Sequence, residues 1–245
     1  MFTEVLVVNL RGKDKSRFVS NMFNRISGRY DLLNTIMTAG MHYSWRKKAT
    51  KYLKKSETGM FLDVATGTGD FAFEILNQKI ANKVVGLDFS VEMLNIGQIK
   101  SEKRNFDKKF VPVVADAHEL PFSDNSFESI TIGFGVRNFV DLSIALEELL
   151  RVLVPGGNLV ILEIVKPEGK IMSRLFPLYF EKITPRIGSI FAGDREAYTY
   201  LPQSVSNFLT STQLAVLMTK KGFKKPVVKK LAFGTVAIVV GQKNE

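Results

Sequence analysis

A short glycine-rich turn constrains the fold of this chain more than any other feature. An apolar run over 60–65 leads into a turn that contains Gly67 and Gly69, and a helical pattern begins at Phe71. Glycine has no Cβ, so these residues permit a tight turn and let a ligand approach the backbone closely. The helix that follows offers unpaired N–H groups and the positive end of its dipole. This arrangement is typical of α/β proteins that bind a nucleotide-like ligand.

Strand and helix patterns alternate along the chain after the turn. Helices are expected from the N-cap Ser90 to about residue 103 and over 142–153. The expected strands are nearly continuous apolar runs, as for strands covered on both faces, and lie at 60–65, 83–88, 110–115, 129–133 and 158–165. The alternation predicts a mostly parallel sheet with helices on both faces and right-handed crossovers.

The last third of the chain departs from this rhythm. Residues 166–202 are rich in aromatic residues and prolines, and we expect them to form a helical substrate insertion over the strand ends. A single helix is then expected over 205–221. Two strands, over 227–232 and 235–241, predict an antiparallel hairpin that closes the sheet.

The N-terminal block, residues 1–56, is interpreted as a helical lid that precedes a ligand-binding domain over 57–245. Residues 1–13 show no clear period and are interpreted as a loose arm. The expected helices lie at about 15–26, 30–37 and 43–53. The block is aromatic and basic. It is either a packing cap over the sheet or a substrate lid that also meets an anionic membrane surface, and we favour the lid.

Composition excludes several kinds of site. The chain has no cysteine, so disulfides and thiolate metal sites are excluded and a cytoplasmic location is expected. Its only histidines are His42 and His118, so we expect no metal. No apolar run approaches the roughly 20 residues of a membrane-spanning helix. The net charge of +10 suggests an anionic partner, or simply a basic surface that keeps the chain in solution.

Acidic residues around the turn indicate which ligand binds there. Residues 67–72 formally fit a dinucleotide fingerprint, but Asp70 would repel a pyrophosphate by several kcal/mol in a partly dry site. Asp63 and Asp70 instead suit the sulfonium and ammonium groups of S-adenosyl-L-methionine. Asp70 is alternatively a partner of the helix dipole.

Two further acidic residues follow the next strands. Asp88 ends the second strand and suits ribose hydroxyls, which dinucleotides and S-adenosylmethionine share. Asp116 and Ala117 follow the third strand and suit an adenine ring, although Asp116 alone is equally a turn residue. Because the carboxyl ends of parallel strands meet at one edge of the sheet, we expect these residues to form one cofactor site.

Longer motifs carry a family resemblance. Segments 63–70, 86–90, 116–122 and 155–157 resemble class I S-adenosylmethionine-dependent methyltransferases. Three more specific stretches resemble the ubiquinone/menaquinone biosynthesis C-methyltransferases. The first combines segments 30–34, 40–42 and 45–46, the second is 133–139, and the third is 192–202. The similarity extends from residue 15 over nearly the whole chain.

The resemblance implies a class I methyltransferase fold with a seven-stranded sheet. It also implies methyl transfer from S-adenosylmethionine to a ring carbon of a polyprenylated quinol, which is demethylmenaquinol or a ubiquinol precursor. The residues expected at the cofactor are Asp63, Thr66, Gly67, Gly69, Asp88, Phe89, Asp116 and Ala117. The family often has a serine where this chain has Gly133, so any side-chain contact is lost there.

A ring carbon becomes nucleophilic once a neighbouring hydroxyl loses its proton. Arg137 is the candidate partner of the resulting phenolate, and it can steer a water molecule but cannot act as a base. Asn138 is the candidate for the second ring oxygen. Residues expected to complete the substrate site are Tyr30, His42, Asp194, Arg195 and Tyr198. For each of these residues, a structural hydrogen bond or a surface ion pair is the alternative.

Other functions stay open at this point. They are a methyltransferase of the same fold with another small or lipid acceptor, a nucleic-acid methyltransferase, and a non-catalytic S-adenosylmethionine-binding protein. Residues 133–138 stand where a nucleic-acid enzyme carries its Asn/Asp-Pro-Pro-Tyr-like loop, so no nucleic acid is expected. Peripheral contact with an anionic membrane and a homodimer are further hypotheses.

Overall fold

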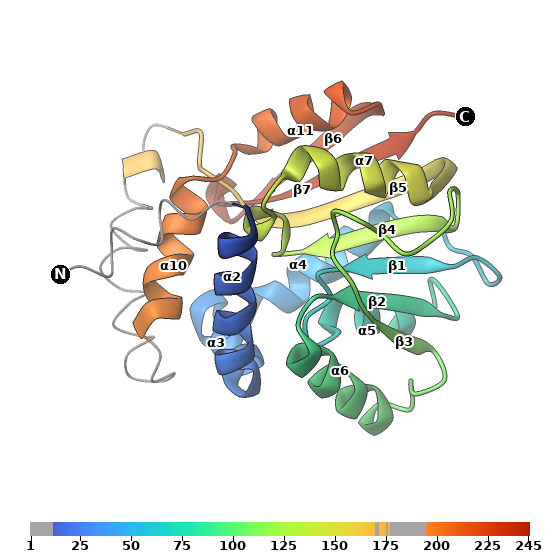
Figure 1. Cartoon of the computed structure of the whole chain (residues 1–245). Coiled ribbons are helices and arrows are strands. Elements are labelled where there is room, and N and C mark those ends of the chain that lie inside the picture. The colour runs from blue at the N-terminus through green and yellow to red at the C-terminus, as the bar shows by residue number, and fades with distance from the viewer. Residues whose placement is uncertain (1–11, 170–171, 175, 177–194) are drawn as a thin grey trace.

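A single sheet of seven strands forms the centre of the computed structural model, which describes residues 12–169, 172–174, 176 and 195–245 (Figure 1). The strand order is β3-β2-β1-β4-β5-β7-β6. The strands are β1 (Phe61–Val64), β2 (Val84–Asp88), β3 (Phe110–Val114), β4 (Phe127–Gly133), β5 (Leu153–Ile164), β6 (Phe223–Leu231) and β7 (Val236–Lys243). The first five pair in parallel, and β7 lies antiparallel between β5 and β6. The predicted fold class and the closing hairpin are therefore confirmed.

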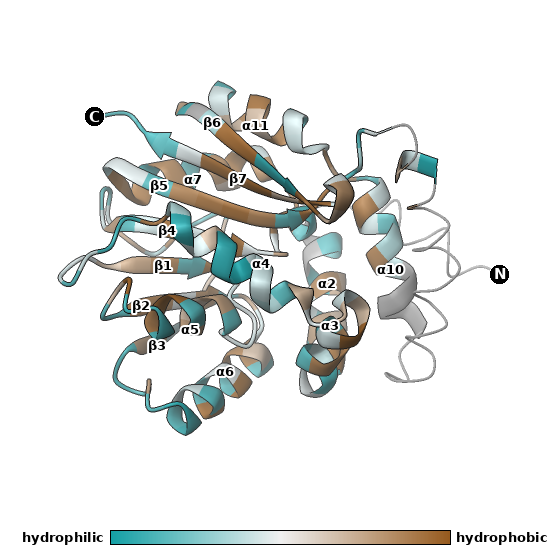
Figure 2. Cartoon of the chain, turned by 180° about the vertical axis from the view of Figure 1, so that it is seen from behind, coloured by the Kyte–Doolittle hydropathy of each residue, from teal (hydrophilic) through white to brown (hydrophobic). Residues whose placement is uncertain are grey.

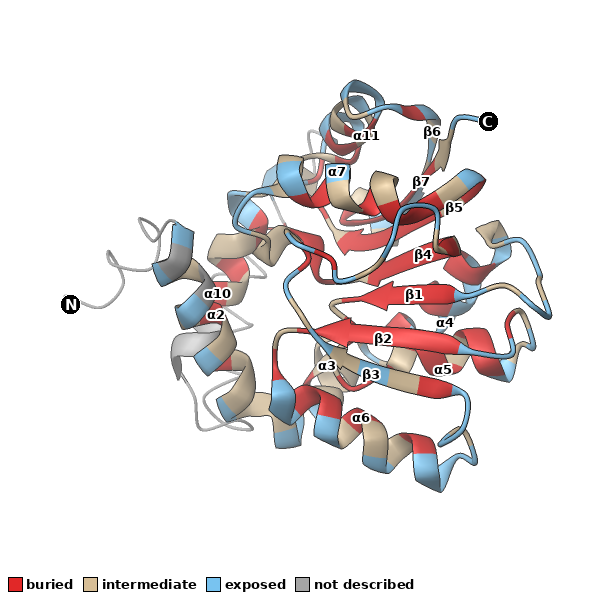
Figure 3. Cartoon of the chain, turned by 45° about the vertical axis from the view of Figure 1, so that its right-hand side comes forward, coloured by how far each residue is buried: buried red, intermediate tan, exposed pale blue. Residues whose placement is uncertain are grey.

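Helices cover both faces of the sheet. On one face, α7 (Leu142–Val152) and α11 (Ser211–Lys220) pack against alternate strand residues such as Leu62. On the other, α4 (Met41–Ala49) and α5 (Asp70–Asn77) pack against the intervening residues, such as Phe61. The strands β1, β2, β4, β5 and β7 are mostly buried, whereas the edge strands β3 and β6 are largely exposed or half-buried (Figure 3). Apolar residues run along β5 and β7 (Figure 2). Successive side chains of a strand point to opposite faces of the sheet, so the central strands contribute to an apolar core on each face.

The N-terminal helices close the edge where the parallel strands end. They are α2 (Gly12–Ile26), η1 (Ser27–Arg29) and α3 (Tyr30–Thr38), while α4 covers a face of the sheet and leads to η2 (Thr50–Tyr52), whose Tyr52 carbonyl accepts from Asn158 of β5. Helix α2 begins at Gly12, inside the segment interpreted as a loose arm, of which residues 1–11 lie outside the described residues. Helices α2 and α3 share a small core with Tyr200 of α10 (Arg195–Ser206), and the three lie together at this edge (Figure 1).

The expectation of one helix over 205–221 is wrong. Helix α10 ends at Ser206, and α11 begins after the N-cap Thr210. The Thr210 hydroxyl accepts from the Gln213 N–H, and the Gln213 side chain accepts from the Thr210 N–H. This capping box starts a new helix at a Thr-x-x-Gln pattern that is visible in the sequence.

Two other boundaries differ from the prediction. Pro202 lies within α10, so the expected end of the insertion falls inside a helix. Strand β5 begins at Leu153, directly after α7, and its pairing with β4 shifts register across the Pro-Gly-Gly segment at 155–157. Residues 177–194, which include Asp194, lie outside the described residues. Among the helices that the structure does describe, none is long and apolar enough to cross a membrane.

Candidate active site

The glycine-rich turn between β1 and α5 is held from below by a buried carboxylate. Gly67 and Gly69 have φ angles of 55° and 84°, in the left-handed region that favours glycine. The two Asp63 oxygens accept hydrogen bonds from the Thr66 and Thr131 hydroxyls, both at 2.6 Å. Burial raises the pKa of Asp63 to about 6, against these hydrogen bonds. In this geometry Asp63 and the Thr66 hydroxyl order the turn.

Asp88 joins the end of β2 to the same turn. Its Oδ2 accepts from the Gly67 N–H at 2.8 Å, and its Oδ1 accepts from the Ser90 N–H at 2.9 Å. Ser90 caps α6 (Val91–Lys103) as predicted, accepting from the Met93 N–H. Burial raises the pKa of Asp88 to about 6, against its backbone hydrogen bonds. The carboxyl group is thus mostly ionised at pH 7, and each oxygen keeps a lone pair for a further donor.

Four adjoining cavities run from the end of β3 to α10 and α11. The first, the Asp116 cavity, is lined by Ala65, Asp88, Phe89, Asp116, Ala117 and Asn138. The second, the Gly67 cavity, is lined by Tyr30, Gly67, Asp88, Phe89, Gly133 and Asn138. The third, the Asn34 cavity, is lined by Tyr30, Leu33, Asn34, Arg137, Tyr200 and Leu201. The fourth, the Gln203 cavity, of about 380 Å³, is lined by Lys15, Phe139, Arg137, Tyr200, Gln203 and Leu209.

Each cavity shares lining residues with the next. Asn138 borders the first and second, Tyr30 borders the second and third, and Arg137 borders the third and fourth. Predicted cofactor residues line the first two cavities, namely Gly67, Asp88, Phe89, Asp116 and Ala117. The structure therefore brings these five together, while Asp63, Thr66 and Gly69 support the turn beside them.

Arg137, on η3 (Val136–Asn138), is buried against a carboxylate that the sequence reasoning missed. Its NH1 donates to Glu163 Oε1 at 2.6 Å and to the Phe134 carbonyl at 2.5 Å. Glu163 is fully buried on β5, and its burial raises the pKa of that carboxyl against the opposing charge of Arg137. Burial disfavours the charged guanidinium, but Glu163 outweighs this and raises the pKa of Arg137. The sequence did carry a signal for this pair, because Glu163 is the one acidic residue in the apolar run 158–165.

Tyr200 of α10 connects the insertion to η3. Its hydroxyl donates to Asn138 Oδ1 at 3.1 Å, and its ring packs 5.8 Å from the Phe18 ring of α2. Burial raises the pKa of Tyr200 to about 12. The predicted Arg195 and Tyr198 lie on the same helix, but their side chains are outside the described part. Tyr200 thus lines the third and fourth cavities, and the roles of Arg195 and Tyr198 stay predictions.

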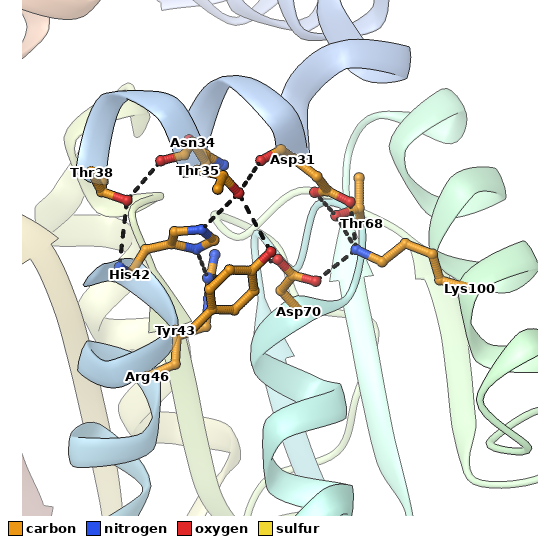
Figure 4. A network of polar contacts seen from close by, with 10 residues as sticks. All are labelled: Asp31, Asn34, Thr35, Thr38, His42, Tyr43, Arg46, Thr68, Asp70 and Lys100. Atoms are coloured by element: carbon orange, nitrogen blue, oxygen red, sulfur yellow. Dashed lines mark hydrogen bonds and ion pairs between the residues drawn. The ribbon is translucent and has the colours of Figure 1, made fainter. Parts of the chain in front are cut away.

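A network of polar contacts ties α3 and α4 to the glycine-rich turn (Figure 4). The Lys100 ammonium of α6 donates to Asp31 Oδ2 at 2.7 Å, to Thr68 Oγ1 at 2.9 Å and to Asp70 Oδ1 at 2.6 Å. Arg46 lies 3.7 Å from the second Asp70 oxygen. Burial opposes ionisation of Asp70, but Arg46 and Lys100 outweigh it and lower the pKa. Two cations of the chain thus contact Asp70, and its role toward a cationic ligand stays a prediction.

His42 also belongs to this network. Its ring contacts the Thr35 hydroxyl at 3.2 Å and the Arg46 guanidinium, and it lines none of the four cavities (Figure 4). Burial and Arg46 lower the pKa of His42 to about 4, so it is neutral at pH 7. Its contacts support the packing of α3 on α4. Within the described ranges, no three His, Asp or Glu side chains gather in a group that would hold a metal ion.

Comparison with known proteins decides the family. The model of the ubiE/COQ5 methyltransferase family matches residues 11–243. The chain belongs to the ubiE/COQ5 methyltransferase family. The ubiquinone/menaquinone biosynthesis C-methyltransferase UbiE of Geotalea daltonii is 40% identical over 231 residues, which cover 94% of this chain and 98% of that protein. The demethylmenaquinone methyltransferase of Deinococcus radiodurans is 40% identical over 232 residues, which cover 95% of each chain.

A solved structure supports the fold of this ubiE/COQ5 family member. A SAM-dependent methyltransferase of Thermotoga maritima superposes with a TM-score of 0.64 and 22% identity, covering 92% of this chain and 99% of that one. The predicted class I methyltransferase fold and the resemblance are thus confirmed, and the chain is a methyltransferase. Family and fold together support S-adenosylmethionine as the methyl donor.

We predict that affinity for S-adenosylhomocysteine falls as the pH drops below 6. Ribose hydroxyls donate to the ionised form of Asp88, and protonation near its pKa of about 6 removes an acceptor. The dissociation constant, measured by calorimetry, should rise about tenfold per pH unit below that value. Asp88→Asn should bind weakly at pH 7.5 and lose most of the pH dependence. The exposed Asp124→Asn is the matched control, and a flat wild-type profile between pH 7.5 and 5 would contradict the assignment.

We predict that Lys100→Met loosens the N-terminal helices and the glycine-rich turn together. The change leaves Asp31 without this ion pair and Asp70 with Arg46 alone. Unfolding in denaturant should show a loss of about 1–3 kcal/mol, and S-adenosylhomocysteine should bind more weakly. The exposed Lys103→Met on the same helix should change neither quantity. Equal effects of the two substitutions would show that Lys100 has no special role.

Proposed function

We propose that this chain transfers the methyl group of S-adenosylmethionine to a ring carbon of a polyprenylated quinol, with demethylmenaquinol as substrate and menaquinol as product. Membership of the family and the names of the two relatives support this reaction. The observation that carries the proposal is a buried, permanently charged Arg137 that borders a cavity next to the cofactor residues. Neither a different class of acceptor nor a non-catalytic role has support in the comparisons.

The first two cavities suit the methyl donor. Asp88 presents a buried carboxylate for the ribose hydroxyls, and Asp116 and Ala117 border the space for the adenine. A Cβ added at Gly67 would have only the Tyr30 ring within 4 Å, so the turn backbone is open to a ligand there. When bound, S-adenosylmethionine supplies a methyl group made electrophilic by its sulfonium. Asp63, Thr66 and Gly69 hold the turn that receives it.

Arg137 provides the charge that the acceptor needs. Glu163 fixes the guanidinium through NH1 and keeps it protonated, while Nε has no hydrogen-bond partner among the described residues. A positive group placed beforehand stabilises negative charge as it develops on the phenol oxygen, in a site from which water is largely excluded. The proton itself passes to water, since Arg137 does not deprotonate. With S-adenosylmethionine bound, the ring carbon beside that oxygen would take the methyl group as the methyl–sulfur bond breaks, and S-adenosylhomocysteine would leave. The hydrogen on that carbon would then pass to water as a proton, which restores the aromatic ring.

Asn138 lies at the two cavities that suit the methyl donor. It borders the Asp116 and Gly67 cavities, and the Tyr200 hydroxyl holds its Oδ1, which leaves its amide N–H groups for a ligand. We propose that Asn138 orients donor and acceptor relative to one another. Tyr30 borders both the Gly67 and the Asn34 cavity and suits the same purpose. Asp194, Arg195 and Tyr198 stay proposed substrate residues, and His42 acts through the packing of α3.

We predict that the chain methylates a short-tailed demethylmenaquinol and that Arg137→Lys abolishes most of this activity. Lysine keeps a positive charge for Glu163 but lacks the Nε–H. Transfer from radiolabelled S-adenosylmethionine should fall at least about 100-fold in kcat, with S-adenosylhomocysteine affinity retained. Arg151→Lys, in a partly exposed ion pair on α7, is the control and should keep full activity. Absence of transfer by the wild-type chain to naphthoquinols and benzoquinols alike would overturn the proposed reaction.

A polyprenylated acceptor resides in the membrane, so the proposal includes peripheral contact with anionic lipid. Exposed basic residues on and after α4 support this contact, and they are Lys47, Lys48 and Lys51. Basic clusters bind anionic surfaces at about 1 kcal/mol per residue. Cosedimentation with phosphatidylglycerol vesicles should be strong at low salt and lost at high salt, and replacing the three lysines with glutamine should weaken it. Lack of binding at any salt concentration would refute this part.

A further inference from the structure

Unsatisfied polar atoms gather at the third and fourth cavities. Among the described residues, four buried side-chain nitrogen or oxygen atoms lack a hydrogen-bond partner. Three of them belong to residues that line these adjoining cavities: Asn34 Nδ2, Arg137 Nε and Gln203 Oε1. A buried polar atom without a partner costs about 1–3 kcal/mol, so proteins rarely keep one without a reason. Their concentration around empty space indicates a ligand that supplies the partners.

The Asn34 cavity restricts what that ligand is. Its unsatisfied atoms are both nitrogen donors, one from the Asn34 amide on α3 and one from the Arg137 guanidinium on η3. The ligand must therefore present oxygen acceptors. Most of the remaining lining is apolar, from Met22, Phe23, Ile26, Leu33, Met37 and Leu201. An apolar ring that carries oxygens satisfies both requirements.

The Asn34 side chain makes a weak polar contact with the Tyr30 hydroxyl. This contact opposes the rise in pKa that burial causes at Tyr30, but Asn34 Nδ2 forms no hydrogen bond within ordinary distance and angle limits. Asn138 was the expected partner of the second ring oxygen, but it lines the two cofactor cavities and is held by Tyr200. Asn34 is thus the better placed amide for the acceptor.

We infer that the acceptor ring binds in the Asn34 cavity, with Arg137 Nε donating to the oxygen beside the reacting carbon and Asn34 Nδ2 donating to the opposite oxygen. This inference rests on the proposed function. Tyr30 and Phe23 border both this cavity and the Gly67 cavity, so the ring lies next to the space for the methyl group. Asn34 is then a binding residue that distinguishes a ring with two oxygens from a ring with one.

Calorimetry on the chain saturated with S-adenosylhomocysteine tests this assignment without requiring turnover. The probes are 2-methyl-1,4-naphthohydroquinone, kept reduced, and 2-methyl-1-naphthol, which lacks only the oxygen assigned to Asn34. The wild-type chain should bind the hydroquinone about tenfold more tightly, as expected for one hydrogen bond. Asn34→Leu and Asn34→Ala should bind the two probes equally, because neither side chain donates or accepts a hydrogen bond. Leu32→Ala, on the exposed side of the same helix, should keep the tenfold preference.

The outcomes separate the two proposals. A wild-type chain without preference, or an Asn34 variant that folds and keeps the preference, overturns the assignment of Asn34. Thermal unfolding of both variants with S-adenosylhomocysteine reports on folding, and the smaller Ala side chain provides the test if the Leu variant is unstable. Failure of the proposed function would appear elsewhere, as absence of methyl transfer to any quinol by the wild-type chain.

Discussion

The Lys100 ammonium joins the N-terminal helices to the glycine-rich turn, together with the hydrogen bond from Thr68 to Asp31 and the ion pair of Arg46 with Asp70. It reaches from α6 to Asp31 on α3 and to Thr68 and Asp70 at the start of α5. The position of α3 in turn sets Tyr30 and Asn34 at the cavities. Lys100, which lines none of the four cavities, thus joins the turn that we propose for the donor to the helix that borders the cavity proposed for the acceptor. Holding two reactants close together lowers a reaction barrier by several kcal/mol. The alignment that the Lys100 contacts provide therefore matters more for catalysis than their contribution to folding stability.

Buried carboxylates near the ends of the parallel strands have different roles, which depend on their hydrogen-bond and ion-pair partners. Asp63 on β1 binds two hydroxyls and shapes the turn, while Asp88 on β2 binds backbone N–H groups and keeps lone pairs for a ligand. Glu163 on β5 meets a full positive charge and holds Arg137 in place. Removing one partner of such a buried pair leaves an uncompensated charge, typically costing 3–5 kcal/mol. Buried carboxylates therefore have three roles here: Asp63 shapes the turn, Asp88 is available to a ligand, and Glu163 holds the charged Arg137.

Sequence alone predicted those parts of the fold that depend on local pattern. The strand–turn–helix around Gly67, the Ser90 cap and the C-terminal hairpin all follow from neighbouring residues, and all are confirmed. Contacts distant in sequence were out of reach. Asp70 and Lys100 lie 30 residues apart, and Arg137 and Glu163 lie 26 apart, so neither pairing has a local signal. The capping box at Thr210 was local and was missed, which merged two helices.

A crystal structure of the chain with S-adenosylhomocysteine and a short-tailed demethylmenaquinol analogue tests the central claim, that donor and acceptor bind in adjoining cavities between the strand ends and α2–α3. We predict the adenosine at Asp88 and Asp116, and the ring in the Asn34 cavity with one oxygen at Arg137 Nε. A ring bound in the Gln203 cavity or on the outer surface, with Arg137 Nε unengaged, would contradict it.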